Sequence, residues 1–277
     1  MPTLTRILAA ATATLALSAS PAIAGPPVEI SVQLTDQLSS ATNASAGSGW
    51  SRLTISANHE VDLAILRNKP NIDTGYLAND VGKIPVTKYG KYGIFVARGT
   101  VKPGKPYVTT INTLSTRRYT VVVFDDSTLT NGSGNNDTYS AGDWLVPTTP
   151  GGGEPPTTTA SITLTDKSIK AVGLTSSAPI KVTNAGKRLH ELTAYPVKAG
   201  AKAEQALELA RQGLVKRVKT AGAPTRIMGL VDGKTTQYLE PGLKAGTYLL
   251  VSGEGRKRTA GQSHAAQGLA VIATVKP

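Results

Sequence analysis

Two histidines and a serine in the last third of the chain carry the residue types from which a reactive site is built. His190 opens the segment His190-Glu191-Leu192, Ser252 ends a run that starts at Thr247, and His264 precedes Leu269 by five positions. Imidazole is a frequent metal ligand and general base, and a neighbouring hydroxyl can act as a nucleophile. The chain contains no cysteine, so a copper centre that needs a thiolate ligand is excluded.

These residues allow either a metal site or a hydrolytic site. Imidazoles from distant segments suit Cu(II) or Zn(II), with Glu191 or Glu254 as an oxygen ligand. A hydrolase would join Ser252 and His264 to one of these glutamates, but the Leu-Val-Ser-Gly-Glu-Gly context lacks the nucleophile-elbow pattern. We therefore expect no enzyme and no cofactor, with metal binding through His190 and His264 as the alternative.

The first half of the chain has fewer residues suited to a site. His59 could be the counterpart of His190, but no second histidine lies in this half. Trp50 and Trp144 could stack on sugars, although tryptophan in a small sandwich is more often part of the core. Four aspartates around an Asn- and Gly-rich loop could hold calcium loosely or lie in solvated turns: Asp125, Asp126, Asp137 and Asp143.

Short strands are predicted in both halves. Residues 28–34 and 53–56 alternate apolar and polar side chains, and residues 119–124 form the continuous apolar run of a buried strand. In the second half the candidates are residues 162–164, 180–182, 192–197, 238–239, 248–251 and 269–275. Gly and Pro turns separate these runs, which predicts antiparallel β-sandwiches rather than βαβ units.

One segment has the pattern of a helix. Residues 203–212 are strong helix formers, and Ala206, Leu209 and Ala210 recur at spacings of three and four. Gly213 follows as a natural end of the helix. We expect a single short helix that packs over a sheet edge or an open end of the sandwich and has a structural role.

Composition divides the chain into four parts. Residues 1–24 place Arg6 before an apolar stretch and end in Ala22-Ile23-Ala24, which predicts a secretory signal peptide. Residues 147–161 are rich in Pro, Thr and Gly and predict a linker. The remaining parts are an N-terminal domain, residues 25–146, and a C-terminal domain, residues 162–277. No later segment is long and apolar enough to predict a membrane span.

The two halves also share a weak internal similarity. Residues 49–63 resemble residues 178–192, with gaps, and the pair of segments 101–104 and 118–123 resembles 239–242 and 247–252. The matches keep their order along the chain. A duplicated sandwich is one interpretation, and two unrelated sandwiches are the other.

The C-terminal half resembles the cupredoxin, or plastocyanin-like, family over about 100 residues. The resemblance rests on Asn184 and His190, on the Pro241-Gly242 and Gly246-Thr247-Tyr248 turns, and on the segment from His264 to Leu269. It implies a Greek-key sandwich in which two histidines, a cysteine and a methionine bind copper. His190 and His264 match the histidines, whereas Ser252 and Leu269 stand at the cysteine and methionine positions. The fold class implied is therefore all-β with one short helix, as two tandem antiparallel Greek-key sandwiches with a degenerate copper site.

The net charge of +12 is concentrated in the second half. Residues 25–146 contain 11 Lys and Arg against 10 Asp and Glu, whereas residues 161–277 contain 18 against 7. Two clusters carry much of the excess: Lys216, Arg217 and Lys219 after the helix, and Arg256, Lys257 and Arg258 before His264. Such clusters can bind phosphates or carboxylates of a polymer with an affinity that falls as salt rises. Alternatively, they are solvated and only keep the protein soluble through like-charge repulsion.

Together these features predict an exported binding or scaffolding protein of the cell envelope, secreted to the periplasm or beyond. Its basic C-terminal domain would contact an anionic polymer or a protein partner. No aromatic residues are interleaved with the basic clusters, so specific nucleic acid recognition is not expected. The alternative is a copper-binding protein derived from an electron carrier.

Overall fold

The computed structural model describes residues 25–34, 40–42, 49–72, 86–114, 117–124, 139–145, 153–240, 242–252, 265 and 267–277. The predicted signal peptide, residues 1–24, lies outside these residues. In the described part of the chain, no helix combines the length and the apolar character that a membrane crossing would need.

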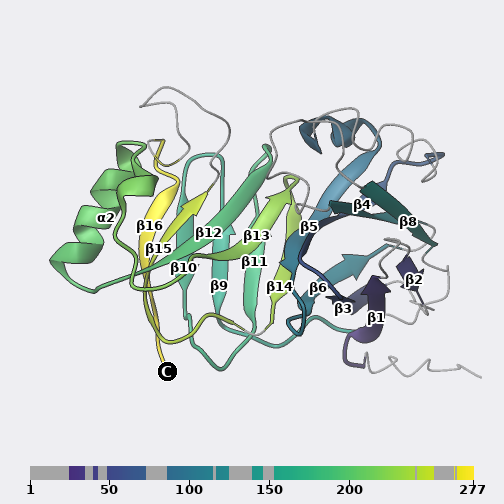
Figure 1. Cartoon of the computed structure of the whole chain (residues 1–277), viewed down its shortest axis with the longest axis horizontal. Helices are drawn as coiled ribbons and strands as arrows, with labels where there is room; N and C mark the ends of the chain where they lie inside the picture. Colours follow the sequence, from purple (N-terminus) through teal and green to yellow (C-terminus); the bar gives the residue numbers. More distant parts are fainter. Residues whose placement is uncertain are drawn as a thin grey trace, which may run out of the picture.

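The described residues of the N-terminal half form eight strands, whose arrangement is drawn in Figure 1. They are β1 (Val28–Leu34), β2 (Ser40–Thr42), β3 (Gly49–Ala57), β4 (Val61–Asn68), β5 (Gly93–Val101), β6 (Tyr107–Thr113), β7 (Arg118–Phe124) and β8 (Tyr139–Leu145). The 3₁₀ helix η1 (Val86–Lys91) lies between β4 and β5. The strands pair in the orders β6-β3-β1-β2 and β5-β4-β7-β8, which form the two layers of a sandwich.

The C-terminal half repeats this arrangement strand by strand. Its strands are β9 (Ser161–Leu164), β10 (Ile169–Val172), β11 (Ile180–Asn184), β12 (His190–Val197), β13 (Thr225–Val231), β14 (Thr235–Leu239), β15 (Gly246–Ser252) and β16 (Ala270–Val275). They pair in the orders β14-β11-β9-β10 and β13-β12-β15-β16. Helix α2 (Ala201–Arg211) and the 3₁₀ helix η3 (Val215–Arg217) lie between β12 and β13, where the first half has η1.

The sandwiches contain one parallel pair each, so they are not purely antiparallel. β1 runs parallel to β3, and β9 runs parallel to β11, whereas the other strand pairs are antiparallel. In each case a short strand intervenes in the sequence, and a chain that reverses twice returns to its starting direction. The fold class predicted from the sequence is otherwise confirmed: in the part of the chain that the structure describes, the protein is all-β with one α-helix, arranged as two tandem sandwiches.

Each sandwich has its own apolar core because its strands alternate. In β3, Leu53 and Ile55 are fully buried, while the residues that alternate with them, Arg52 and Thr54, face outward. They pack with apolar residues of β1, β4, β6 and β7. A separate cluster, which includes Ile162, Val182 and Leu250, fills the second sandwich.

Strands β4 and β15 are buried along nearly their whole length because both of their faces are covered. In β4, Leu63 and Ile65 face the first core, whereas Ala64 and Leu66 pack beneath Tyr89 of η1. In β15, Leu249 and Val251 pack beneath α2, which buries its alanines against the sheet. The predicted helix is therefore present, beginning two residues earlier than expected, and it covers the face of a sheet rather than an edge.

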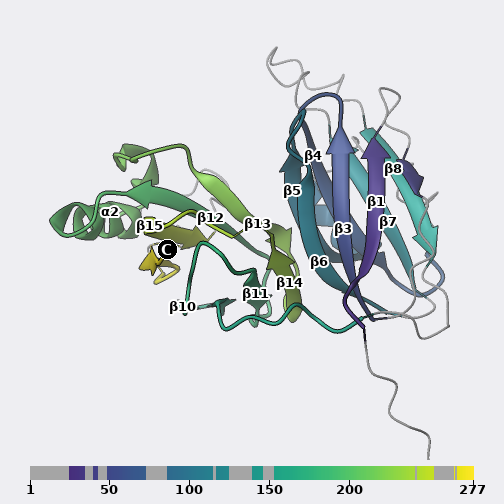
Figure 2. The ribbon, with the colours of Figure 1, turned by 90° about the horizontal axis from the view of Figure 1, so that it is seen from below.

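The two halves join through equivalent strands. β14 pairs with β6, with Tyr238 opposite Thr110, so that two four-stranded layers form one eight-stranded sheet. β13 also lies against β5 (Figure 2). The strands approach closely, because Gly229 of β13 lies so near the side chain and backbone of Arg98 that no Cβ would fit there. The halves are thus held together by backbone hydrogen bonds and close packing.

Residues 153–160, the described part of the predicted linker, contact both halves. The backbones of Gly153 and Trp50 exchange hydrogen bonds, and the amide of Glu154 donates to the carbonyl of Gly25 at 2.7 Å. The Thr158 hydroxyl donates to the carbonyl of Pro179 in the second half at 2.6 Å. The last predicted linker residue, Ser161, is the first residue of β9. The domain boundaries themselves remain a prediction.

Candidate functional site

His190 is held at the start of β12 by the loop that precedes it. The buried Asn184 side chain donates to the carbonyls of Arg188, at 2.9 Å, and Val231, at 3.1 Å. Its amide oxygen accepts the N–H of Gly186. These bonds fix the turn between β11 and β12 and therefore the position of the imidazole, which is 1% exposed.

Ser252 and His190 form a buried hydrogen bond. They lie at neighbouring positions of β15 and β12, where Ser252 is opposite Leu192. The Ser252 Oγ lies 3.1 Å from Nδ1 of His190, and Ser252 has no exposed surface. This contact links β12 and β15 at one end of the second sandwich.

The second ring nitrogen of His190 contacts Asp166. Nε2 lies 3.2 Å from Oδ1 of Asp166, which belongs to the turn between β9 and β10. The same carboxylate accepts the backbone N–H groups of Lys187 and Arg188 at 3.0 Å. The N–H groups of Arg188 and then Lys187, followed by His190, hold the pKa of Asp166 below its ordinary value. The sequence analysis missed Asp166, because a turn aspartate carries no signal for a partner 24 residues away.

The other positions of the predicted copper site differ in what the structure describes. Leu269 is buried in the second core, and its carbonyl accepts the N–H of Ser252 at 3.0 Å. His264 and Glu254 lie outside the described residues. The predicted approach of His190 to His264 therefore stays a prediction.

The donors that are present do not fit a blue-copper centre. The position of the thiolate holds the hydroxyl of Ser252, which is bonded to His190, and the methionine position holds the hydrocarbon side chain of Leu269. Both ring nitrogens of His190 are within hydrogen-bond distance of a side chain. Among the residues that the structure describes, no three His, Cys, Asp or Glu side chains gather as metal ligands would.

The Ser252–His190–Asp166 series also differs from a hydrolytic triad. A nucleophilic serine must meet a substrate, whereas Ser252 is fully buried. The ring is also reversed, since Nδ1 faces the serine and Nε2 faces the aspartate. The arrangement is that of a polar network that anchors three segments: β12, β15 and the turn between β9 and β10.

His59 lies two residues before Val61, where β4 begins, and its side chain is partly buried. His190 is the first residue of β12, the strand that occupies the equivalent place in the second half. The correspondence of His59 with His190 stays a prediction.

The first predicted basic cluster lies on the surface beside α2. Lys216 and Arg217 belong to η3, Lys219 follows, and all three are exposed. Val215 and Val218 alternate with them and are buried against the helix and the sheet. The segment that carries these three cations is thus held in place by its two buried valines. The second cluster, Arg256, Lys257 and Arg258, lies outside the described residues.

Ion pairs cross the junction between the halves. Arg226 of β13 contacts Asp62 of β4 at 3.1 Å, and the Thr100 hydroxyl also donates to this carboxylate. At the other sheet, Arg52 lies 3.1 Å from Glu240, which also accepts the hydroxyl of Thr110. The halves therefore meet through matched charges as well as strand pairing.

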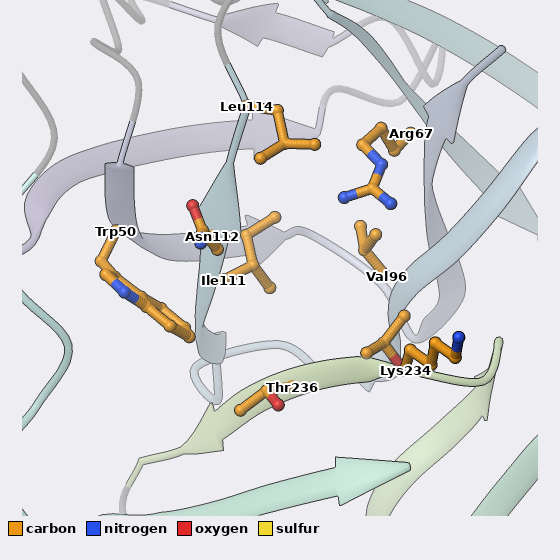
Figure 3. A pocket seen from close by; sticks show the side chains of 9 residues that line it. Trp50, Arg67, Val96, Ile111, Asn112, Leu114, Lys234 and Thr236 are labelled. Atoms are coloured by element: carbon orange, nitrogen blue, oxygen red, sulfur yellow. The ribbon is translucent and has the colours of Figure 1, made fainter. Parts of the chain in front are cut away.

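Two hollows lie at this junction. An open cleft of about 790 Å³ runs between β12, β13 and the turn after β5, and its walls include Tyr107, Tyr195 and Arg226. A smaller cavity of about 200 Å³ is lined by residues of β3, β4, β5, β6 and β14, among them Trp50 (Figure 3). Trp50 is therefore partly exposed rather than part of the core. The side chain of Trp144, on β8, is not described.

No protein-family model matches the chain, and no curated protein does. Among solved structures, the dithionite-reduced auracyanin of the photosynthetic bacterium Roseiflexus castenholzii is 14% identical, with a TM-score of 0.24, over 42% of this chain and 95% of its own. The copper-containing nitrite reductase of Thermus scotoductus is 10% identical, with a TM-score of 0.26, over 90% of this chain and 61% of its own.

A third similar structure is the multicopper oxidase McoA of Aquifex aeolicus, 11% identical, with a TM-score of 0.25, over 90% of this chain. The chain spans 65% of that oxidase. Likenesses this low carry no argument. The repeated strand topology defines the class of the molecule, which is an all-β protein of two tandem β-sandwiches.

Proposed function

We propose that this chain is an exported, non-catalytic binding protein of the cell envelope, whose basic C-terminal half contacts an anionic polymer or a protein partner. The observation that supports it is the exposed cluster of Lys216, Arg217 and Lys219, whose neighbours Val215 and Val218 are buried. Clustered cations on a fixed surface hold a polyanion with less loss of side-chain and backbone freedom than cations on an unanchored segment would.

The polar network around His190 supports a structural rather than a catalytic role for Asp166, His190 and Ser252. Its groups bond to each other and to backbone, and two of the three residues are buried. The N-terminal half would serve as a spacer or recognition module. Because strand pairing joins it to the second half, the two would move together rather than on a flexible tether.

Retention on an anionic matrix at increasing salt tests the proposal. The triple variant Lys216→Gln, Arg217→Gln, Lys219→Gln should elute at lower salt than the unaltered protein. A matched control removes the same charge elsewhere in this half, at three other exposed lysines: Lys170→Gln, Lys181→Gln, Lys276→Gln. Equal losses in both triple variants would show that retention follows net charge alone and would refute the cluster as the contact surface.

The second cluster needs its own variant. Neutralising Arg256, Lys257 and Arg258 together should lower the eluting salt concentration further if both clusters face the same polymer. Retention that none of the three triple variants alters would exclude the C-terminal half as the anion-binding part.

A further inference from the structure

The smaller junction cavity brings together residues from both halves. Trp50 of β3 and Asn112 of β6 form one wall, and Lys234 and Thr236, at the start of β14, form the floor (Figure 3). Arg67 of β4 enters from the opposite side, with its guanidinium directed toward Val96. The cavity exists only because the two sandwiches meet.

Two cations, Arg67 and Lys234, line this cavity, and no carboxylate is among the described residues that line it. Arg67 also interacts with the hydroxyl of Tyr119 and with the carboxylate of Asp232, which lies outside the lining and accepts the N–H of Phe95 at 2.7 Å. The lining itself is therefore positively charged, which favours an anionic ligand.

Trp50 adds a flat apolar surface to this charged space. Its ring packs edge-on against Tyr238, with centroids 5.2 Å apart, and its backbone is bonded to Gly153. The indole is thus held in place while part of it remains exposed. Asn112 and Thr236 add an amide and a hydroxyl at the rim. An aromatic face beside hydrogen-bonding groups suits the apolar face and hydroxyls of a sugar ring.

We propose that this cavity binds one acidic sugar unit, a hexuronate, with its ring against Trp50 and its carboxylate toward Arg67 and Lys234. The volume of about 200 Å³ is below that of most pockets for drug-sized ligands, about 300 to 1,000 Å³, and suits one ring. This site is separate from the basic cluster at residues 216–219 and does not depend on it.

The backbone at Lys234 provides a precise test variant. Its φ is 61°, a left-handed conformation that glycine adopts more easily than lysine. Lys234→Gly removes the charge and eases the backbone, so the variant should fold at least as well as the original chain. The matched control is Lys170→Gln, which removes an exposed charge from β10.

Calorimetric titration of the full mature chain with galacturonate measures the binding. We expect a dissociation constant of about 1 mM and a loss of roughly tenfold in affinity in Lys234→Gly, since one charged contact is removed. Trp50→Leu should weaken binding to a similar degree. Lys170→Gln, and neutralisation of residues 216, 217 and 219, should leave the affinity unchanged.

The probes and variants separate the competing explanations. Galactose binding as tightly as galacturonate would overturn the role of the cations, and acetate binding as tightly would overturn recognition of the ring. Unchanged galacturonate affinity in Lys234→Gly would overturn the site even if Trp50→Leu did not fold. Matrix retention reports on the proposed function independently, so either hypothesis can fail alone.

Discussion

Ser252→Ala tests whether the polar network around His190 stabilises the second sandwich. The Ser252 Oγ is fully buried 3.1 Å from Nδ1 of His190, so the variant removes a hydrogen bond that solvent cannot replace. A typical buried hydrogen bond contributes about 0.5 to 1.5 kcal/mol, and desolvation of the remaining group adds about 1 to 3 kcal/mol. We expect the free energy of unfolding of the C-terminal half to fall by about 2 kcal/mol.

Ser51→Ala provides the matched control in the other sandwich. Ser51 is also fully buried, and its Oγ lies 3.1 Å from Oγ1 of Thr113. The Thr113 hydroxyl keeps its bond to the carbonyl of Gly49 when Ser51 is removed. This control should therefore cost about 1 kcal/mol or less.

Hydrogen exchange in urea measures both variants in their own halves. Tryptophan fluorescence would not separate the two halves, because Trp50 of the first half packs against Tyr238 of the second. Peptides from β12 and β15 should lose protection at lower urea in Ser252→Ala, while peptides from β3 and β6 should not. A cost for Ser252→Ala no larger than that for Ser51→Ala would refute the reasoning.

Four further predictions follow from the structure. The pKa of Asp166 is lower in the folded protein than its ordinary value of about 4. The stability that its carboxylate contributes should therefore be fully present above about pH 4 and be lost as the pH falls through the folded pKa. Urea melts should show Asp166→Asn to be less stable than the parent chain at neutral pH, with the difference disappearing at low pH. A double-mutant cycle of Asp62→Asn and Arg226→Gln should give a coupling free energy of about 0.5 kcal/mol for this ion pair between the halves. A coupling of zero would show that this partly exposed pair does not contribute to stability. Burial raises the pKa of Tyr107 to about 12, so spectrophotometric titration should lose its highest phenol transition in Tyr107→Phe; stability from the neutral phenol is present below about pH 10 and declines toward pH 12. Calorimetry with Cu(II) should show affinity weaker than about micromolar and no intense blue absorption, whereas tight binding abolished by His190→Ala would favour the copper alternative.

The strands were predictable because local alternation and long-range burial agree. In β3, the apolar positions 53 and 55 face the core, as their spacing requires. The helix was predictable because its alanine-rich face must be buried, and Leu249 and Val251 on the outer face of β15 pack against it. The parallel pairs were not predictable from alternation, because period-two patterning is the same for both strand directions.

The site was less predictable because its members meet through long-range register. Neither Asp166 nor the pairing of β14 with β6 leaves a local pattern in the sequence. Composition located the basic cluster at residues 216–219. Only the structure showed that Val215 and Val218 are buried and hold this segment against the helix and the sheet.

The pairing of β6 with β14 also bears on solubility. An uncovered edge strand offers free backbone donors and acceptors to any other chain, and natural proteins shield such edges from aggregation. Here each half shields the corresponding edge of the other. Either half expressed alone would expose that edge, and because β6 and β14 occupy equivalent places, a second copy of the same half could take up the absent partner's role. The tandem arrangement gives in one polypeptide what a separate half would have to obtain by dimerising.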